Sequence, residues 1–288
     1  MDGGALIKLP LKKLAVLCTT LSVLALSQTP VIGQTIQQTK QRLGAIAERA
    51  SESNISTYFF VGKSCRLLFL GTRHTFDPQS PIFKIVDENW EVFSPTLLIV
   101  EGGSWKNLVD VGPTIEQQGE MGYLALRGRK GGIDITSFEP PEDDLKIAAS
   151  RLHSSEDIKL YMLLRMVPQW RNSKTGIDIQ SQATKYLGTQ MNDKSRPLSI
   201  SDVDQMVRKL FHQDSDWTQL DATMKINGIE SNVIKKVDFT VNAIRNAKLI
   251  EAISQSIKEK RRVMIAAGNT HLGALLAELN QLESSCLN

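Results

Sequence analysis

The chain has 288 residues, which is enough for one sizeable domain or for one domain with a large insertion. Its hydrophobic content of 41% is ordinary for a globular protein. The formal net charge is only +3, the basic residues are scattered and aromatic residues make up 6% of the chain, so we expect no nucleic-acid partner.

The N-terminus has the pattern of a secretory signal peptide. Basic side chains at Lys8, Lys12 and Lys13 precede an apolar run, Leu14–Leu26, that is too short to span a bilayer comfortably. We therefore expect residues 1–33 to be a signal peptide and the protein to be secreted or periplasmic, with no stable membrane insertion after cleavage. An uncleaved membrane anchor is the alternative.

Two cleavage positions fit the small residues that follow the apolar run. Val31 and Gly33 occupy suitable positions before Gln34, and Ala25 and Ser27 provide a second option. Cleavage at the first position makes Gln34 the mature N-terminus.

Two cysteines, Cys65 and Cys286, remain in the expected exported chain. Export would allow them to form a disulfide, but two buried thiols are equally compatible with so few cysteines. A bond between them would tie the C-terminal tail to the first core strand.

The first half of the chain shows helical patterns that alternate with short apolar runs. Helices are predicted over residues 34–53, 82–93 and 119–129. Strands are predicted over residues 57–61, 66–70, 96–100 and 133–138. The first two strands flank a short link that contains glycine, which is typical of a hairpin.

The second half begins with residues 145–235, which contain helix-like segments and no strand of comparable quality. We interpret this region as a helical insertion. A long amphipathic helix over 237–257 then leads into a last apolar strand at 263–267, and a helix over 274–282 closes the chain.

These elements together predict an α/β fold with a mostly parallel central sheet, flanking helices and a helical insertion. We expect a single α/β hydrolase-like domain over residues 34–288. Its core would be formed by residues 57–144 and 237–282, on either side of the insertion.

Two short stretches share one pattern, in which an apolar run is followed by glycine, two residues and histidine. They end at His74 and His271. We expect each glycine to let the chain turn sharply as it leaves its strand, so that the histidine stands at the edge of the sheet where ligands bind. Because Glu101 and Glu139 follow two further strands, four ionisable side chains should gather at this edge.

Two kinds of chemistry fit these side chains. His74, Glu101 and His271 would bind a divalent ion such as Mn, Co or Zn and leave positions open for water and substrate. Without a metal, a histidine can act as general base while a glutamate orients it or acts as acid. Arg245, on the long helix before the last strand, would clamp an anionic substrate group or stabilise an oxyanion.

Each of these residues also has a purely structural explanation. His74 would cap the following helix, Glu101 would stabilise the positive end of the next helix, and His271 would satisfy backbone groups at a helix N-terminus. Arg245 would make a surface ion pair, and Glu139 would be a solvated loop acid.

The remaining polar residues receive simpler assignments. Glu139 and Arg73 are the candidate substrate-binding residues. Glu120 is expected to be an ordinary helix acid, and His153 and His212 are expected to be structural or to lie on the surface.

Four of these features resemble a known superfamily. They are the motifs Gly71–His74 and Gly268–His271, the Ile-Val-Glu strand end at Glu101, and Arg245 upstream of the second motif. Together they resemble the TraB/PrgY and Tiki group and the related erythromycin-esterase-like and ChaN-like proteins. The resemblance covers the predicted core and not the helical middle of the chain. The pair Gly119-Glu120, followed by residues 137–141, is similar to the esterase-like branch.

The resemblance implies an α/β core with helical insertions and a site made from the two histidines, Glu101 and Arg245. The Tiki branch implies a metal-dependent protease, the esterase-like branch implies lactone cleavage with a histidine as base, and the ChaN-like branch implies haem binding. The resemblance therefore does not fix one reaction.

Three hypotheses follow. The first is an exported hydrolase, metal-assisted or histidine-based, that cleaves a peptide, ester or lactone bond in a small-molecule or peptide substrate. The second is a non-enzymatic protein that holds a metal or a haem with the same residues. The third is a scaffold without activity.

Overall fold

The structure is a computed structural model that describes residues 35–103, 105, 109–172, 176, 178–189, 198–211, 216–220 and 233–287. The predicted signal peptide and His212 lie outside the described residues. In the part of the chain that is described, no helix is both long and apolar enough to cross a membrane.

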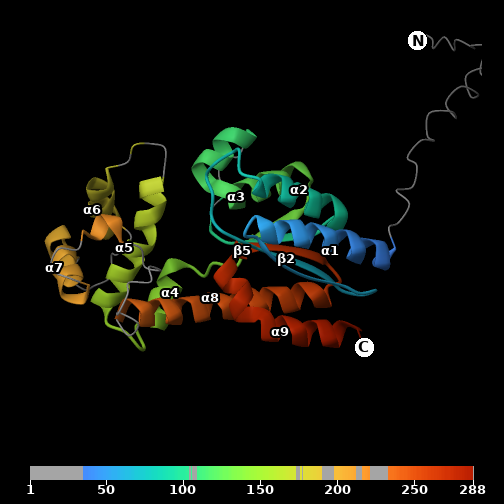
Figure 1. Cartoon of the computed structure of the whole chain (residues 1–288). Helices are drawn as coiled ribbons and strands as arrows, with labels where there is room; N and C mark the ends of the chain where they lie inside the picture. Colours follow the sequence, from blue (N-terminus) through green and yellow to red (C-terminus); the bar gives the residue numbers. More distant parts are fainter. Residues whose placement is uncertain are drawn as a thin grey trace, which may run out of the picture. The chain divides into compact units, whose positions relative to one another are not determined.

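The centre of the fold is a five-stranded sheet with the order β1-β2-β5-β3-β4. The strands are β1 Ser56–Val61, β2 Arg66–Thr72, β3 Leu97–Val100, β4 Asp134–Ser137 and β5 Arg262–Gly268. β1 and β2 form the predicted antiparallel hairpin, and all other neighbours are parallel. The predicted fold class, a mostly parallel sheet flanked by helices, is confirmed (Figure 1).

The three inner strands are apolar between their end residues because both faces of the sheet are covered. Alternate residues of each strand enter two separate hydrophobic clusters, as the two-residue period of a strand requires. Leu68 of β2 and Met264 of β5 belong to one cluster, and Phe69 and Ile265 belong to the other. β5, the last strand in sequence, is therefore buried at the centre of the sheet.

Helices from the two ends of the chain cover opposite faces (Figure 1). One face packs against α1 Ile36–Glu52, α2 Ile82–Phe93 and α3 Val111–Lys130. The other packs against α8 Val233–Lys258 and α9 Asn269–Leu287. α9 begins five residues earlier than the sequence predicted, so His271 lies in the first turn of a helix and not in a loop.

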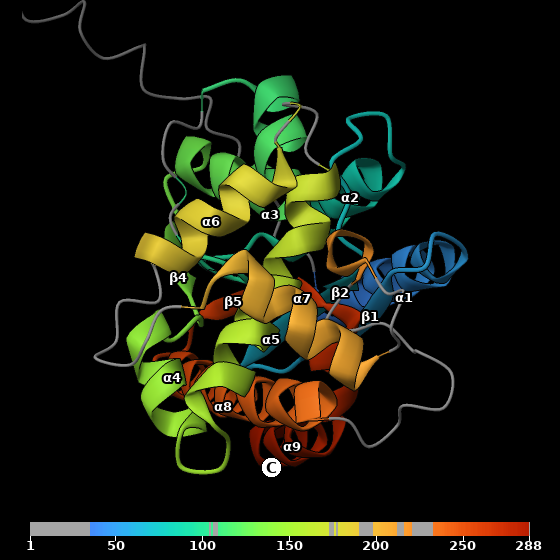
Figure 2. The same cartoon turned by 90° about the vertical axis from the view of Figure 1, so that its left-hand side faces the viewer.

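The region between β4 and β5 contains helices and a hydrophobic core of its own. The helices are α4 Glu142–Ala149, α5 Ser155–Asn172, α6 Ile179–Thr189, α7 Ile200–Leu210 and a short 3-10 helix, Trp217–Gln219. α8 connects the two cores, since Val237 packs among these helices and Leu249 packs under the sheet. Figures 1 and 2 show α5, α6 and α7 beyond the end of the sheet at which β5 passes into α9.

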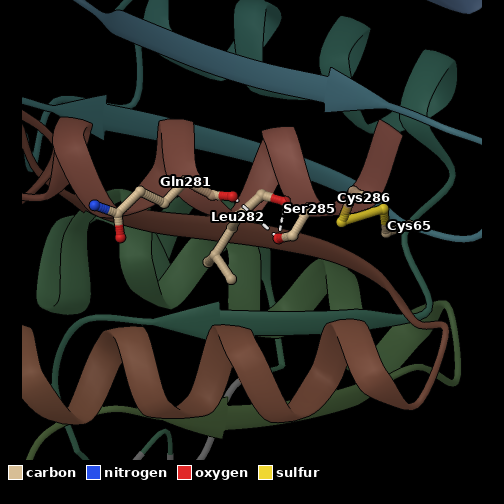
Figure 3. Close-up of a disulfide and its surroundings, with 5 residues drawn as sticks. All are labelled: Cys65, Gln281, Leu282, Ser285 and Cys286. Carbon is tan, nitrogen blue, oxygen red and sulfur yellow. Dashed lines mark hydrogen bonds between the residues drawn. A yellow bond between two sulfur atoms is a disulfide. The ribbon is translucent and has the colours of Figure 1, made fainter. Parts of the chain in front are cut away.

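A disulfide joins Cys65 to Cys286, with the two Cα atoms 6.0 Å apart (Figure 3). Of the two possibilities that the sequence left open, the structure therefore contains the bonded one. The bond fixes the last turns of α9 beside the beginning of β2, at the end of the sheet opposite to the predicted site.

Candidate functional site

The structure brings four of the predicted side chains together at the carboxyl edge of the parallel strands. His74 follows β2, Glu101 follows β3, and His271 begins α9 directly after β5. The Nε2 atoms of His74 and His271 each lie 3.7 Å from an oxygen of Glu101, one on either side of the carboxylate. Glu139, which follows β4, is joined to this group through Arg245.

The two glycines of the repeated motif serve close approach and not a sharp turn. Gly71 and Gly268 are the penultimate residue of β2 and the last residue of β5, and neither has a positive φ angle, so the expected reason for them was wrong. A Cβ atom on Gly71 would lie 2.6 Å from Oδ1 of Asn269. Gly268 donates its N–H to Oε2 of Glu101 at 2.7 Å, and a Cβ there would lie 3.4 Å from that oxygen. Small residues therefore let the strand ends and the carboxylate approach each other.

Arg245 is a buried connector between two carboxylates. Its side chain is 3% exposed, and its Nε donates to both oxygens of Glu139, at 3.1 and 2.9 Å. Nη2 donates to Glu101 at 2.6 Å and also to Glu139, and Nη1 donates to Asn242 at 2.9 Å. Burial by itself would lower the pKa of Arg245, but its hydrogen bonds and its attraction to Glu139 and Glu101 outweigh burial and raise the pKa. Arg245 is therefore a fixed buried cation, and the expectation of a surface ion pair does not apply.

Glu101 is held in its ionised form. Burial tends to raise the pKa of its carboxyl group. The nearby imidazole of His271 and the positive charges of Arg245 and His74 overcome this effect and hold the pKa well below its usual range. Since its oxygens accept from Arg245 and from the Gly268 N–H, the carboxylate points into the cluster and does not cap the helix that follows it.

Glu120 is the site residue that the sequence analysis missed, because it was expected to be an ordinary helix acid. Its carboxylate is 1% exposed and lies 2.9 Å from Nδ1 of His74. The same carboxylate accepts hydrogen bonds from the Thr72 hydroxyl at 2.9 Å and from the Thr75 backbone N–H at 3.0 Å. The available signal was the Gly119-Glu120 pair that carries the resemblance to the esterase-like branch.

A break in α3 places Glu120 against His74. Gly119 has φ 62° and ψ −157°, which interrupts the helix and turns the following residue toward the strand ends. A Cβ atom at this position would lie 2.8 Å from the carbonyl oxygen of Thr75. Both the positive φ angle and the close approach therefore require glycine.

The two histidines have different surroundings. The His74 side chain is 52% exposed, and its hydrogen bond with Glu120 is the main reason that its pKa rises to about 9, although burial acts in the opposite direction. His271 is 3% exposed, its Nδ1 lies 2.6 Å from Oδ1 of Asn246, and its ring meets the edge of Phe138. His74 can therefore meet a substrate from solvent, whereas His271 forms part of the buried support.

The helical region also reaches the site, through Arg165 of α5. Its Nη2 lies 3.6 Å from Glu139, and the side chain is partly exposed. Arg73, predicted to bind substrate, has an exposed side chain, and among the described residues no hydrogen bond or ion pair joins that side chain to the cluster. His153 bonds Thr240 at 2.8 Å, away from the cluster.

As arranged here, His74, Glu101 and His271 do not fit a metal ion well. Both oxygens of Glu101 already accept strong hydrogen bonds, one of them from a guanidinium group whose charge would repel a divalent cation. Among the described residues, no group of three or more His, Cys, Asp or Glu side chains has an arrangement that could hold a metal. A haem could reach only His74, since both nitrogens of the buried His271 ring face other side chains. Binding of a metal ion or of a haem by these residues therefore stays a prediction.

Comparison with known proteins finds no relative of this chain. No protein-family model matches the chain, and neither a curated protein nor a solved structure matches it. The resemblance to the TraB/Tiki, erythromycin-esterase-like and ChaN-like superfamily therefore stays a prediction that rests on the motifs themselves.

Proposed function

We propose that the protein is a hydrolase in which His74 acts as general base on water to cleave an ester, lactone or peptide bond. The observation that carries the proposal is the pair of His74 and Glu120. The ring is half exposed at the carboxyl edge of the sheet, while the carboxylate that holds its Nδ1 is buried. This combination is typical of a histidine that is oriented for proton transfer.

In the proposed reaction, Nε2 of His74 takes a proton from water while the water oxygen bonds to the carbonyl carbon of the substrate. Glu120 holds the ring through Nδ1 and stabilises the imidazolium that forms. When the tetrahedral intermediate collapses, the bond to the leaving group breaks, and the leaving oxygen or nitrogen takes the proton back from His74.

Arg245 has a different part in this proposal from the one first expected. Its guanidinium group is buried and donates to Glu139, Glu101 and Asn242, so it positions the carboxylates and is not available as a clamp for substrate. Arg165 is the better candidate to meet an anionic group or a developing oxyanion. It is partly exposed, and its one ion pair with a described residue spans 3.6 Å.

A substrate panel tests the proposal. Chromogenic esters, aromatic lactones and fluorogenic peptides would be offered to the purified protein, to His74→Ala and to His153→Ala, whose histidine lies outside the site. We expect turnover of at least one bond class, a loss of roughly a hundredfold or more in His74→Ala, and wild-type rates in His153→Ala. An absence of turnover for every bond class, or a wild-type rate in His74→Ala, would contradict the proposal and favour a binding protein.

We further propose that the protein is exported. The N-terminal pattern of basic residues, apolar run and small residues supports this, and so does the disulfide, since such bonds persist in oxidising compartments. N-terminal sequencing of the exported protein should begin at Gln34 or Gln28. A mature form that still carries Leu14–Leu26 would contradict the proposal.

A further inference from the structure

A second concentration of charge lies at the end of the sheet opposite to the candidate site. Arg66 and Arg262 begin β2 and β5, whereas the catalytic edge follows the other ends of the same strands. At about 3.3 Å per residue, the two ends of a seven-residue strand are roughly 20 Å apart. A shallow hollow at this end is lined by Lys63, Ser64, Arg66, Lys260, Arg261 and Arg262. We call it the basic hollow.

The cations of the basic hollow are poorly neutralised. Arg66 and Arg262 are paired in the parallel register of β2 and β5, so their side chains leave the sheet on the same face. Burial, and after it the charge of Arg66, lowers the pKa of Arg262. These effects mean that the protein holds two like charges close together at a cost in stability.

The hollow has one acidic partner within the described part of the chain. Asp134 pairs with Arg261 and is 72% exposed. Arg261 and Arg262 also donate hydrogen bonds to backbone carbonyls. Arg261 donates to the carbonyl oxygen of Thr96, and Arg262 donates to that of Ser94. Carbonyl oxygens orient a guanidinium group but do not neutralise its charge.

The turn that carries Lys63 and Ser64 is held rigidly. The Gly62 N–H donates to the Cys65 carbonyl at 2.8 Å, and the disulfide from Cys65 to Cys286 fastens the end of the turn to α9 (Figure 3). Cations on a fixed frame lose less conformational freedom when they close on a ligand, so the hollow is preorganised.

We propose that the basic hollow binds a phosphate-type anion, either free or as a lipid headgroup. Guanidinium groups bind phosphate oxygens in pairs, and lysines add point charges around the same group. A phosphate group held by Arg66 and Arg262 would relieve the repulsion between them. The inference is independent of the proposed hydrolase, because the two sites lie at opposite ends of the strands.

Binding by the double variant Lys63→Gln/Arg66→Gln tests the inference. Neither residue makes an ion pair or side-chain hydrogen bond with a described residue, so the exchange removes charge without removing support. The control is Lys84→Gln/Arg151→Gln, which removes the same charge at exposed positions elsewhere on the chain. Wild type, the double variant and the control variant are all prepared with the same N-terminus, so the basic residues of the N-terminal segment contribute equally to anion binding in each.

Two probes distinguish the two sources of the anion. Titration calorimetry with inorganic pyrophosphate reports a free anion. Sedimentation with vesicles of phosphatidylglycerol in phosphatidylcholine, against phosphatidylcholine alone, reports a headgroup. We expect wild type and control to bind at least one probe, more weakly at higher salt, and the double variant to bind at least about tenfold more weakly. Failure of the wild type to bind either probe, or an equal loss in the control variant, would overturn the inference.

Discussion

The Glu120 carboxylate lies 2.9 Å from Nδ1 of His74, and the two side chains come from opposite environments. Glu120 is almost wholly buried, whereas the ring it holds is half exposed. A buried carboxylate that holds an exposed imidazole fixes the ring orientation and favours its charged form.

The first prediction concerns pH. The pKa of His74 is raised to about 9, chiefly by the hydrogen bond with Glu120, so the ring is protonated at neutral pH. A general base must lose its proton before it can act, so kcat/KM should rise as pH increases from 6 toward 9 and should level off above that value. In Glu120→Gln the inflection should move down toward the ordinary histidine value of about 6.5. A flat wild-type profile over this range would contradict the assignment of His74 as base.

The second prediction concerns Gly119. In Gly119→Ala the new Cβ would meet the carbonyl oxygen of Thr75 at a positive φ angle, so the variant should lose about 1–3 kcal/mol of unfolding free energy and most of its activity. Gly112→Ala is the matched control, since it lies in the same helix and a Cβ there would meet nothing within 4 Å. Urea unfolding and steady-state rates measure both effects. Equal behaviour of the two variants would show that the break in α3 is not needed.

The third prediction concerns Arg245. In Arg245→Leu the buried carboxylates of Glu101 and Glu139 lose their main partner, which should cost about 3–5 kcal/mol in urea unfolding. Lys248→Leu on the same helix removes an exposed ion pair with Glu251 and should cost less than about 1 kcal/mol. If Arg245→Leu is no more destabilising than Lys248→Leu, Arg245 does not hold the cluster together.

The fourth prediction concerns metal. Arg245 and the Gly268 N–H engage both oxygens of Glu101, so a metal ion would have to compete with them for this carboxylate. The proposed reaction uses His74, Glu120 and water and does not require a metal. Dialysis against a chelator should leave kcat/KM unchanged, and elemental analysis should find no stoichiometric transition metal. A stoichiometric metal, with activity lost on chelation and restored by Mn, Co or Zn, would instead support the predicted set of His74, Glu101 and His271.

The parallel sheet could be predicted because its inner strands carry their signal locally. Residues such as Leu68, Ile99 and Ile265 lie in short, continuous apolar runs, which is the pattern of strands that are buried on both faces. The position of β5 between β2 and β3 could not be predicted, because it depends on pairing between segments nearly two hundred residues apart.

The site was predictable where side chains directly follow strands and was missed where a helix supplies them. His74 and Glu101 follow apolar runs, so parallel pairing alone brings their positions together. Glu120 comes from a helix whose direction depends on the positive φ angle of Gly119, and no hydrophobic pattern reports that angle. Asn246, the partner of His271, lies on α8 beside Arg245 and is recognisable only once the helix is placed under the sheet.

The most direct test of the central claim is a double-mutant cycle on kcat/KM with His74→Ala, Glu120→Gln and their combination, measured on a substrate found with the panel and at a pH above the wild-type inflection near 9, where the ring has lost its proton in every variant that keeps it. Glu278→Gln, an exposed acid on α9, is the control and should keep the wild-type rate. If Glu120 acts through His74, each single variant should lose roughly a hundredfold or more, and the double variant should be no slower than His74→Ala alone. Losses that multiply in the double variant, or a wild-type rate in Glu120→Gln, would contradict the account that the two residues act as one unit.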